Sequence, residues 1–138
     1  MAKVQELRSQ APDSEKITIN LGHVDLGHVD LLIQSGFYSN RSDFIRTAIR
    51  NQITRHDEVV AKSIERLKLD IGLRRITRDE LETARAAGMP LEIQVLGLAT
   101  ISSDVTPELA RAAITSLRVL GTLQASNAVK EALRDRLA

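Results

Sequence analysis

Polar side chains that could hydrogen bond to a ligand occupy alternate positions in the stretch EKITINL: Lys16, Thr18 and Asn20. Apolar β-branched or leucine residues stand between them, and this strict alternation predicts a strand with one polar and one apolar face. Lysine can donate to guanine, asparagine can pair with adenine through two hydrogen bonds, and threonine suits either. An ordinary solvated strand face has the same composition, so the surrounding elements must decide between the two interpretations.

Two of the three histidines stand in the repeated stretch LGHVDLGHVD, residues 21–30. His23 and His28 are five residues apart, whereas a helical metal pair needs a spacing of three or four, and the chain contains no cysteine. We expect the first LGHVD to end the strand and the second to open a helix. Asp25 is then expected as the helix cap, and Asp30 as a solvent-facing residue. No metal and no cofactor are expected.

The other polar residues form no catalytic set. We find no nucleophile with a base and an orienting group, no glycine-rich phosphate loop, and no paired carboxylates in an apolar setting. We therefore expect no enzyme. Net charge is only +1 over 138 residues, which excludes a protein that binds nucleic acid through bulk charge alone. Without an apolar leader or a run of 18 apolar residues, a cytoplasmic protein with no membrane partner is expected.

Two helices are predicted to follow the strand. The first begins near Asp25 and ends at Gly36, which can adopt the left-handed conformation of a helix terminus. The second begins at Asn40, which forms a capping pair with Asp43. Its apolar stripe consists of Phe44, Ile45, Ala48, Ile49 and Ile53. Two arginines off this stripe could belong to a solvated face, to an intersubunit pair or to a DNA backbone contact: Arg46 and Arg50.

Regularly spaced glycines organise the second half. Gly72, Gly97 and Gly121 are 25 and 24 residues apart, and a hydroxyl residue follows each after five positions. Helix-like, alanine-containing segments come next, with caps predicted at Thr77 and Thr106. This pattern indicates about three stacked strand–helix units forming a small parallel sheet over residues 67–138. Two strand–helix units with chance similarity are the alternative. Residues 57–66 could extend the preceding helix or form a linker, and residues 1–14 are expected to be a mobile arm.

A strand and two helices of about 40 residues cannot form a core alone, and a single strand leaves its hydrogen-bonding edge bare. A two-fold dimer solves both problems, because two strands can pair antiparallel while four helices cover their apolar face. The polar face of such a ribbon then presents Lys16, Thr18 and Asn20 twice, in a shape that a DNA major groove accepts. The expected fold class is α+β: a dimeric β-α-α unit over residues 15–56, followed by the repeat domain.

Residues 16–56 resemble the ribbon-helix-helix DNA-binding family of the Arc, MetJ and CopG type. The resemblance rests on KITINL and on GFYSNRSDFIRTAIR, with its glycine–aromatic turn, its polar helix start and its I-R-x-A pattern. It implies that the alternate strand residues read bases. It also implies that the start of the second helix binds a phosphate through backbone N–H groups, at positions Ser39, Asn40, Arg41 and Ser42. Arg41 could instead form a salt bridge with Asp25 or Asp43.

Three functions are compatible with these expectations. The favoured one is a transcriptional regulator, expected to be a repressor, that binds double-stranded DNA as a homodimer and forms higher oligomers through its second half. The second is an antitoxin whose C-terminal half binds a toxin, although such tails are commonly flexible and this one carries regular caps. The third is an architectural protein that coats DNA. The operator, any effector and the oligomer size are not encoded in a readable pattern.

Overall fold

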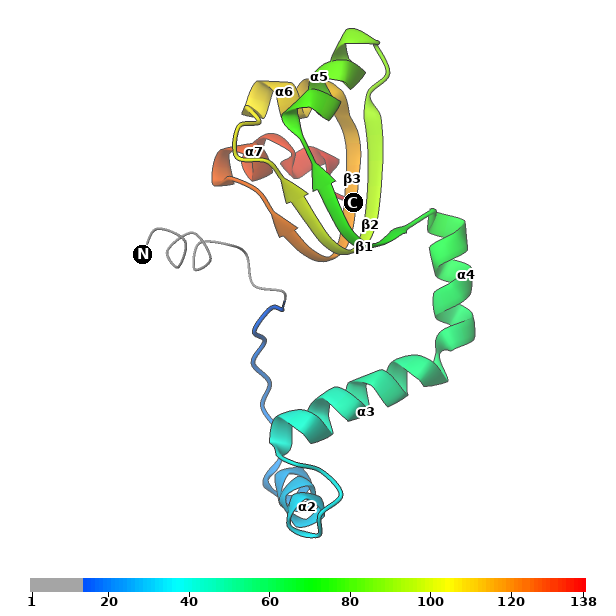
Figure 1. Cartoon of the computed structure of the whole chain (residues 1–138), viewed down its shortest axis with the longest axis vertical. Helices are drawn as coiled ribbons and strands as arrows, with labels where there is room; N and C mark the ends of the chain where they lie inside the picture. The colour runs from blue at the N-terminus through cyan, green and yellow to red at the C-terminus, as the bar shows by residue number, and fades with distance from the viewer. Residues whose placement is uncertain (1–13) are drawn as a thin grey trace. The chain divides into compact units, whose positions relative to one another are not determined.

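The computed structural model describes residues 14–138, so nearly all of the N-terminal arm expected over residues 1–14 lies outside the described residues. The chain divides into two compact units, one ending at Asp57 and the other beginning at Glu58. Figure 1 labels the elements. Their bounds are α2 (His23–Gln34), α3 (Arg41–Arg55), α4 (Asp57–Leu67), β1 (Asp70–Ile76), α5 (Arg78–Ala86), β2 (Leu91–Ile101), α6 (Pro107–Ala113), β3 (Ile114–Gln124), α7 (Asn127–Ala132) and a 3₁₀ turn (Arg134–Arg136).

The repeated stretch LGHVDLGHVD lies mostly on one helix. Helix α2 begins at His23, so the expectation that Asp25 caps it was wrong. Gly22 is the N-cap residue instead; its backbone is extended, and it provides no side-chain hydrogen bond to the first turn. Asp25 falls in the first turn, where a carboxylate interacts favourably with the helix dipole. His23 and His28 therefore share one helix, contrary to the expectation of two different elements.

The ends of α2 and α3 follow the predicted local rules. Gly36 has a φ of 86°, which confirms the left-handed helix terminus. Asn40 caps α3 as predicted, because its side chain accepts the N–H of Asp43. Residues 57–67 are neither a linker nor a continuation of α3. They form the separate helix α4, and His56 interrupts the helical backbone between the two.

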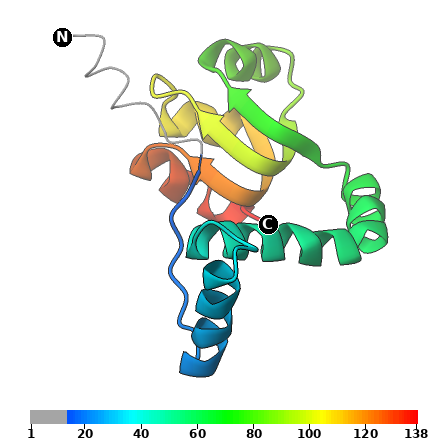
Figure 2. The same cartoon turned by 60° about the horizontal axis from the view of Figure 1, so that its bottom comes forward.

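The second unit is built on three parallel strands in the order β1-β2-β3. Gly72, Gly97 and Gly121 are direct partners across the sheet, so their spacing in the sequence reflects equivalent positions in neighbouring strands. All three have a positive φ. The strands run side by side in Figure 2, with β1 and β3 at the two edges of the sheet. Among the three strands, β1 and β3 therefore each pair with β2 alone.

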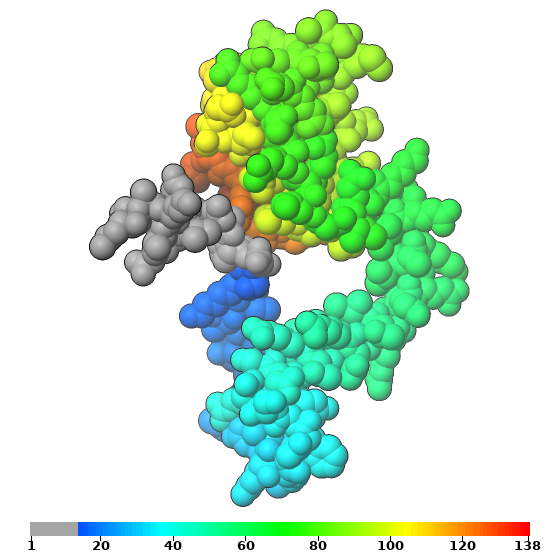
Figure 3. All heavy atoms as spheres, in the orientation of Figure 1, coloured from blue at the N-terminus to red at the C-terminus, as the bar shows by residue number. Residues whose placement is uncertain are grey.

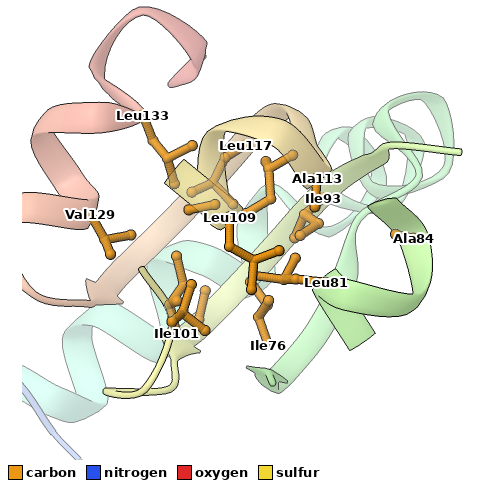
Figure 4. Packing of buried hydrophobic residues seen from close by; sticks show 14 of the residues in the cluster. Ile76, Leu81, Ala84, Ile93, Ile101, Leu109, Ala113, Leu117, Val129 and Leu133 are labelled. Atoms are coloured by element: carbon orange, nitrogen blue, oxygen red, sulfur yellow. The ribbon is translucent and has the colours of Figure 1, made fainter. Parts of the chain in front are cut away.

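Helices α5, α6 and α7 cover one face of the sheet through aliphatic side chains. Leu81, Leu109 and Val129 point from the helices toward strand residues such as Ile101 and Leu117 (Figure 4). Thr77, Thr106 and Ser126 accept the N–H group three residues later and so start these helices. The equivalent hydroxyl residue Ser102 starts no helix: its N–H bonds to the carbonyl of Ile76, and α6 begins five residues further on, at Pro107.

An ion pair ties β1 to α5 on the helix-covered face. The Arg74 guanidinium donates hydrogen bonds to both carboxylate oxygens of Glu80, and these bonds hold the pKa of Glu80 below its ordinary value of 4.5. A lowered folded-state pKa means that the pair stabilises the fold fully above pH 4.5 and progressively less as the pH falls through the lowered value. The stabilisation therefore depends on an ionised Glu80.

Replacing Glu80 with Gln is expected to cost about 1 kcal/mol of unfolding free energy at pH 7, because the side chains of the pair are only 28% and 33% exposed. The difference from wild type should shrink once the pH falls below 4.5, because the wild-type carboxylate then also becomes neutral. Urea unfolding followed by circular dichroism at pH 7 and pH 3 measures both values. Glu58→Gln, in the more exposed pair with Lys62, is the matched control and should change little. An equal loss from Glu80→Gln at both pH values would contradict this assignment.

Candidate nucleic-acid interface

The three strand residues expected to read bases lie in an open segment of the first unit. Lys16, Thr18 and Asn20 are all exposed, and residues 15–22 are assigned to neither helix nor strand. The predicted strand is therefore not formed in the single chain (Figure 1). The physical reason is that a strand needs a hydrogen-bonded neighbouring strand, and no strand of the described residues pairs with residues 16–22.

An apolar groove lies beside this segment within the first unit. It has a volume of about 550 Å³, and aliphatic and aromatic side chains from the segment, α2 and α3 line it. Ile19 and Leu21 contribute from the segment, Val29 from α2, and Phe44 and Ile45 from α3. Val29 is the one buried residue between Ser14 and Asp57. The unit therefore leaves most of its apolar surface uncovered in a single chain.

Polar side chains at the margin of the same groove include His28, Asp25 and Gln52. His28 thus lies beside apolar side chains of α3 rather than in a cluster of metal ligands. Over residues 14–138, no group of three or more histidine or acidic side chains stands close enough to hold a metal ion. Sequence reasoning missed Gln52 and the groove position of His28, because neither lies on the apolar stripes that periodicity reveals.

The four residues expected to bind phosphate surround the start of α3, and all four are exposed. Asn40 uses its side-chain oxygen to accept the Asp43 N–H at 2.8 Å. The Asp43 carboxylate in turn accepts the backbone N–H of Ser39 at 2.9 Å. The backbone N–H groups of Arg41 and Ser42 belong to the first turn, where a helix supplies no carbonyl acceptor. They are the donors at this helix start that could meet an anion.

Arg41 forms an ion pair with Asp30, not with Asp25 or Asp43. Its guanidinium makes two hydrogen bonds to the Asp30 carboxylate, at 2.9 and 2.8 Å. These bonds hold the pKa of Asp30 below its ordinary value and raise the pKa of Arg41. The pair connects the end of α2 to the start of α3. Its partners are 11 residues apart across a turn, so helical spacing carries no signal that could have predicted it.

Comparison with known proteins gives one significant result. A model of the Ribbon-Helix-Helix transcriptional regulator family matches residues 12–130, which is most of the chain. The chain belongs to this family. The match extends through the three-stranded sheet, well beyond the residues 16–56 that carry the sequence resemblance. No curated protein and no solved structure gives a significant match.

Membership makes this ribbon-helix-helix protein a DNA-binding transcriptional regulator, and proteins of the family typically act as dimers. The α+β composition of the structure agrees with that assignment. Among residues 14–138, none of the helices is long and apolar enough to cross a membrane. The family leaves open which side chains contact DNA, and that question depends on the geometry of residues 15–42.

Proposed function

We propose that the protein represses transcription by reading a specific sequence in the major groove with a two-stranded ribbon formed by two copies. The observation that carries this proposal is the segment at residues 15–21. Its polar side chains alternate with apolar ones, and its apolar residues Ile19 and Leu21 face an uncovered apolar groove. A second copy supplies both a hydrogen-bonded strand and a cover for that groove. Lys16, Thr18 and Asn20 then lie on the opposite face, toward base edges.

The phosphate contact proposed for the same dimer lies at the start of α3. Backbone N–H groups of Arg41 and Ser42 would donate to a phosphate oxygen, with the hydroxyls of Ser39 and Ser42 beside them. Arg41 contributes mainly through its ion pair with Asp30, which holds the helix start in place. Such contacts fix the position of the ribbon on the duplex, while the strand side chains select the sequence.

The second unit is folded, and this favours a role as an accessory domain of a repressor. It argues against a tail that becomes ordered only by wrapping around a toxin. Its core contains aliphatic residues from all three strands and from three helices, including the fully buried Ile76, Leu117 and Leu133. A chain segment with such a core needs no partner to become ordered. We propose that this unit serves assembly of the regulator, and that the regulator works in the cytoplasm, where it meets its operator.

The proposal is tested by selecting bound duplexes from a random pool and measuring their affinity by fluorescence anisotropy against scrambled duplexes. The variant Lys16→Ala/Thr18→Ala/Asn20→Ala is expected to lose the preference for selected sequences, because each well-placed base contact contributes about 1–3 kcal/mol of discrimination. Its matched control is Lys62→Ala/Thr83→Ala/Asn127→Ala, which removes three exposed residues of the same types from the second unit. Equal, salt-sensitive binding of wild type to selected and scrambled duplexes would refute sequence reading and favour DNA coating.

A further inference from the structure

The carboxyl ends of the three parallel strands meet at one end of the second unit, and the arrowheads point to the same end in Figure 2. A pocket of about 460 Å³ lies there. It is lined by the last residues of the three strands and by the segments that follow β2 and β3. Ligands of α/β proteins bind outside the carboxyl ends of parallel strands, and this pocket has the size of a small-molecule site.

Three polar side chains of the pocket stand in register on neighbouring strands. Arg75 of β1 is the partner of Thr100 in β2, and Thr100 is the partner of Gln124 in β3. Side chains in register point to the same face of a sheet, so a guanidinium, a hydroxyl and a carboxamide are presented together. This is the face away from the helices, because Ile76 and Ile101, the next residues, point into the helix-covered core (Figure 4).

The segment between β2 and α6 is longer than its counterparts in the other two strand–helix units. Thr77 follows β1 directly and caps α5, and Ser126 holds the same position before α7. After β2 this position belongs to Ser102, yet α6 is capped by Thr106. Residues 102–105 are therefore an insertion into the middle unit, at the end of the sheet where the pocket lies. Such loops on a rigid scaffold commonly carry binding residues.

The inserted segment is held in place by the core and by its own backbone. Val105 is 5% exposed and packs with the core residues. The Ser102 N–H bonds to the Ile76 carbonyl at 3.0 Å, and the Val105 N–H bonds to the Ser102 carbonyl at 3.1 Å. Within the described chain, no hydrogen bond occupies the side-chain hydroxyl of Ser102 or of Ser103. Both residues line the pocket, so their hydroxyls are available to a ligand.

The charge of the pocket is positive. Arg75 is the one charged side chain among the described residues that line it. This arginine is exposed and forms no ion pair with a described residue, whereas the adjacent Arg74 is paired with Glu80. Asp104, the acidic residue of the inserted segment, does not line the pocket. Figure 3 shows green atoms of β1 and α5 at the surface of the unit, so a ligand can reach this strand from solvent.

From this arrangement we propose that the pocket binds the carboxylate or phosphate group of a small organic molecule. The Arg75 guanidinium supplies charge-assisted hydrogen bonds to the anion, and its planar fork suits both groups. The hydroxyls of Ser102 and Ser103 and the amide of Gln124 donate to the remaining oxygens. A ligand bound there bridges the ends of the three strands and the inserted segment. The site does not depend on how the first unit contacts DNA.

NMR of the isotope-labelled full chain, titrated separately with sodium phosphate and sodium acetate, tests this site. Sodium chloride keeps the ionic strength constant. We expect saturable shifts of the amides at residues 75–76, 100–103 and 124–126 with at least one of the two anions. Saturation by phosphate alone identifies a phosphate ligand, and saturation by acetate alone identifies a carboxylate. No DNA is present, so the result is separate from that of the proposed function.

Arg75→Gln is expected to weaken the saturable binding by about tenfold or more, because it removes the charge and keeps a polar side chain. Arg118→Gln is the matched control. Arg118 lies on the same face of the sheet in β3, forms no ion pair with a described residue, and does not line the pocket. Its replacement should leave the affinity unchanged. The amide spectrum of each variant without added anion reports whether the second unit remains folded.

Three outcomes would overturn the proposal. The first is the absence of saturable shifts with both anions. The second is an affinity that Arg75→Gln leaves unchanged. The third is an equal loss in Arg75→Gln and Arg118→Gln, which would mean that anions are attracted to the positive charge of the surface rather than bound in this pocket. Ser102→Ala/Ser103→Ala provides a second variant, which should weaken binding while Arg75 is intact.

Discussion

Replacing Gly97 with Ala is expected to destabilise the second unit by about 3–6 kcal/mol, from backbone strain and steric overlap together. The added Cβ would stand 2.2 Å from a backbone carbonyl oxygen of β1, which no side-chain rotation can move. The φ of 139° adds strain for any residue with a side chain. Because Gly97 lies in the central strand, relieving the overlap would separate β2 from β1.

Gly72→Ala is the matched control for this prediction. It introduces the same methyl group at a φ of 108°, where nothing lies within 4 Å. Its cost should be the strain alone, roughly 1–3 kcal/mol. Hydrogen exchange of the strand amides, measured in dilute protein, separates unfolding of this unit from that of the first. Equal losses for the two variants would show that the carbonyl contact contributes nothing.

The substitutions Ile19→Asp and Thr18→Asp are expected to have different consequences although the residues are neighbours. Ile19 lines the apolar groove, so an aspartate there would place a charge in the proposed dimer interface. We expect loss of the dimer and at least a hundredfold loss of DNA affinity, about 2.7 kcal/mol or more. In the proposed ribbon Thr18 lies on the opposite face, so Thr18→Asp should leave the dimer intact and weaken only DNA binding, by repulsion from phosphates.

Size-exclusion chromatography with light scattering reports the oligomer, and anisotropy on a selected duplex reports the affinity. The design compares the same substitution at adjacent positions, which keeps charge and segment constant. If both variants remain dimeric, the dimer interface does not include the apolar face of residues 15–21. If both become monomeric, the two faces are not separated as a ribbon requires, and the base-reading assignment fails with it.

Short-range features of this protein are readable from the sequence because neighbouring residues alone produce them. Asn40 and Thr77 each cap a helix by accepting an N–H three residues away, and Gly36 ends α2 through its own backbone freedom. The nearly equal spacing of Gly72, Gly97 and Gly121 is also visible, since equivalent strand positions recur at nearly constant intervals. The strand–helix alternation of the second half follows from these signals.

Contacts between distant residues were decided by the tertiary structure. No spacing rule joins Asp30 to Arg41 or brings Leu137 beside Leu117, because both pairings depend on where a turn or a helix sends the chain. The start of α2 at His23 was missed because an aspartate in the first turn resembles one at the cap. Residues 16–22 carry the pattern of a strand, but no strand of the described residues pairs with them. Local sequence thus determined which residues can form a strand, whereas pairing, as in any sheet, depends on a second segment.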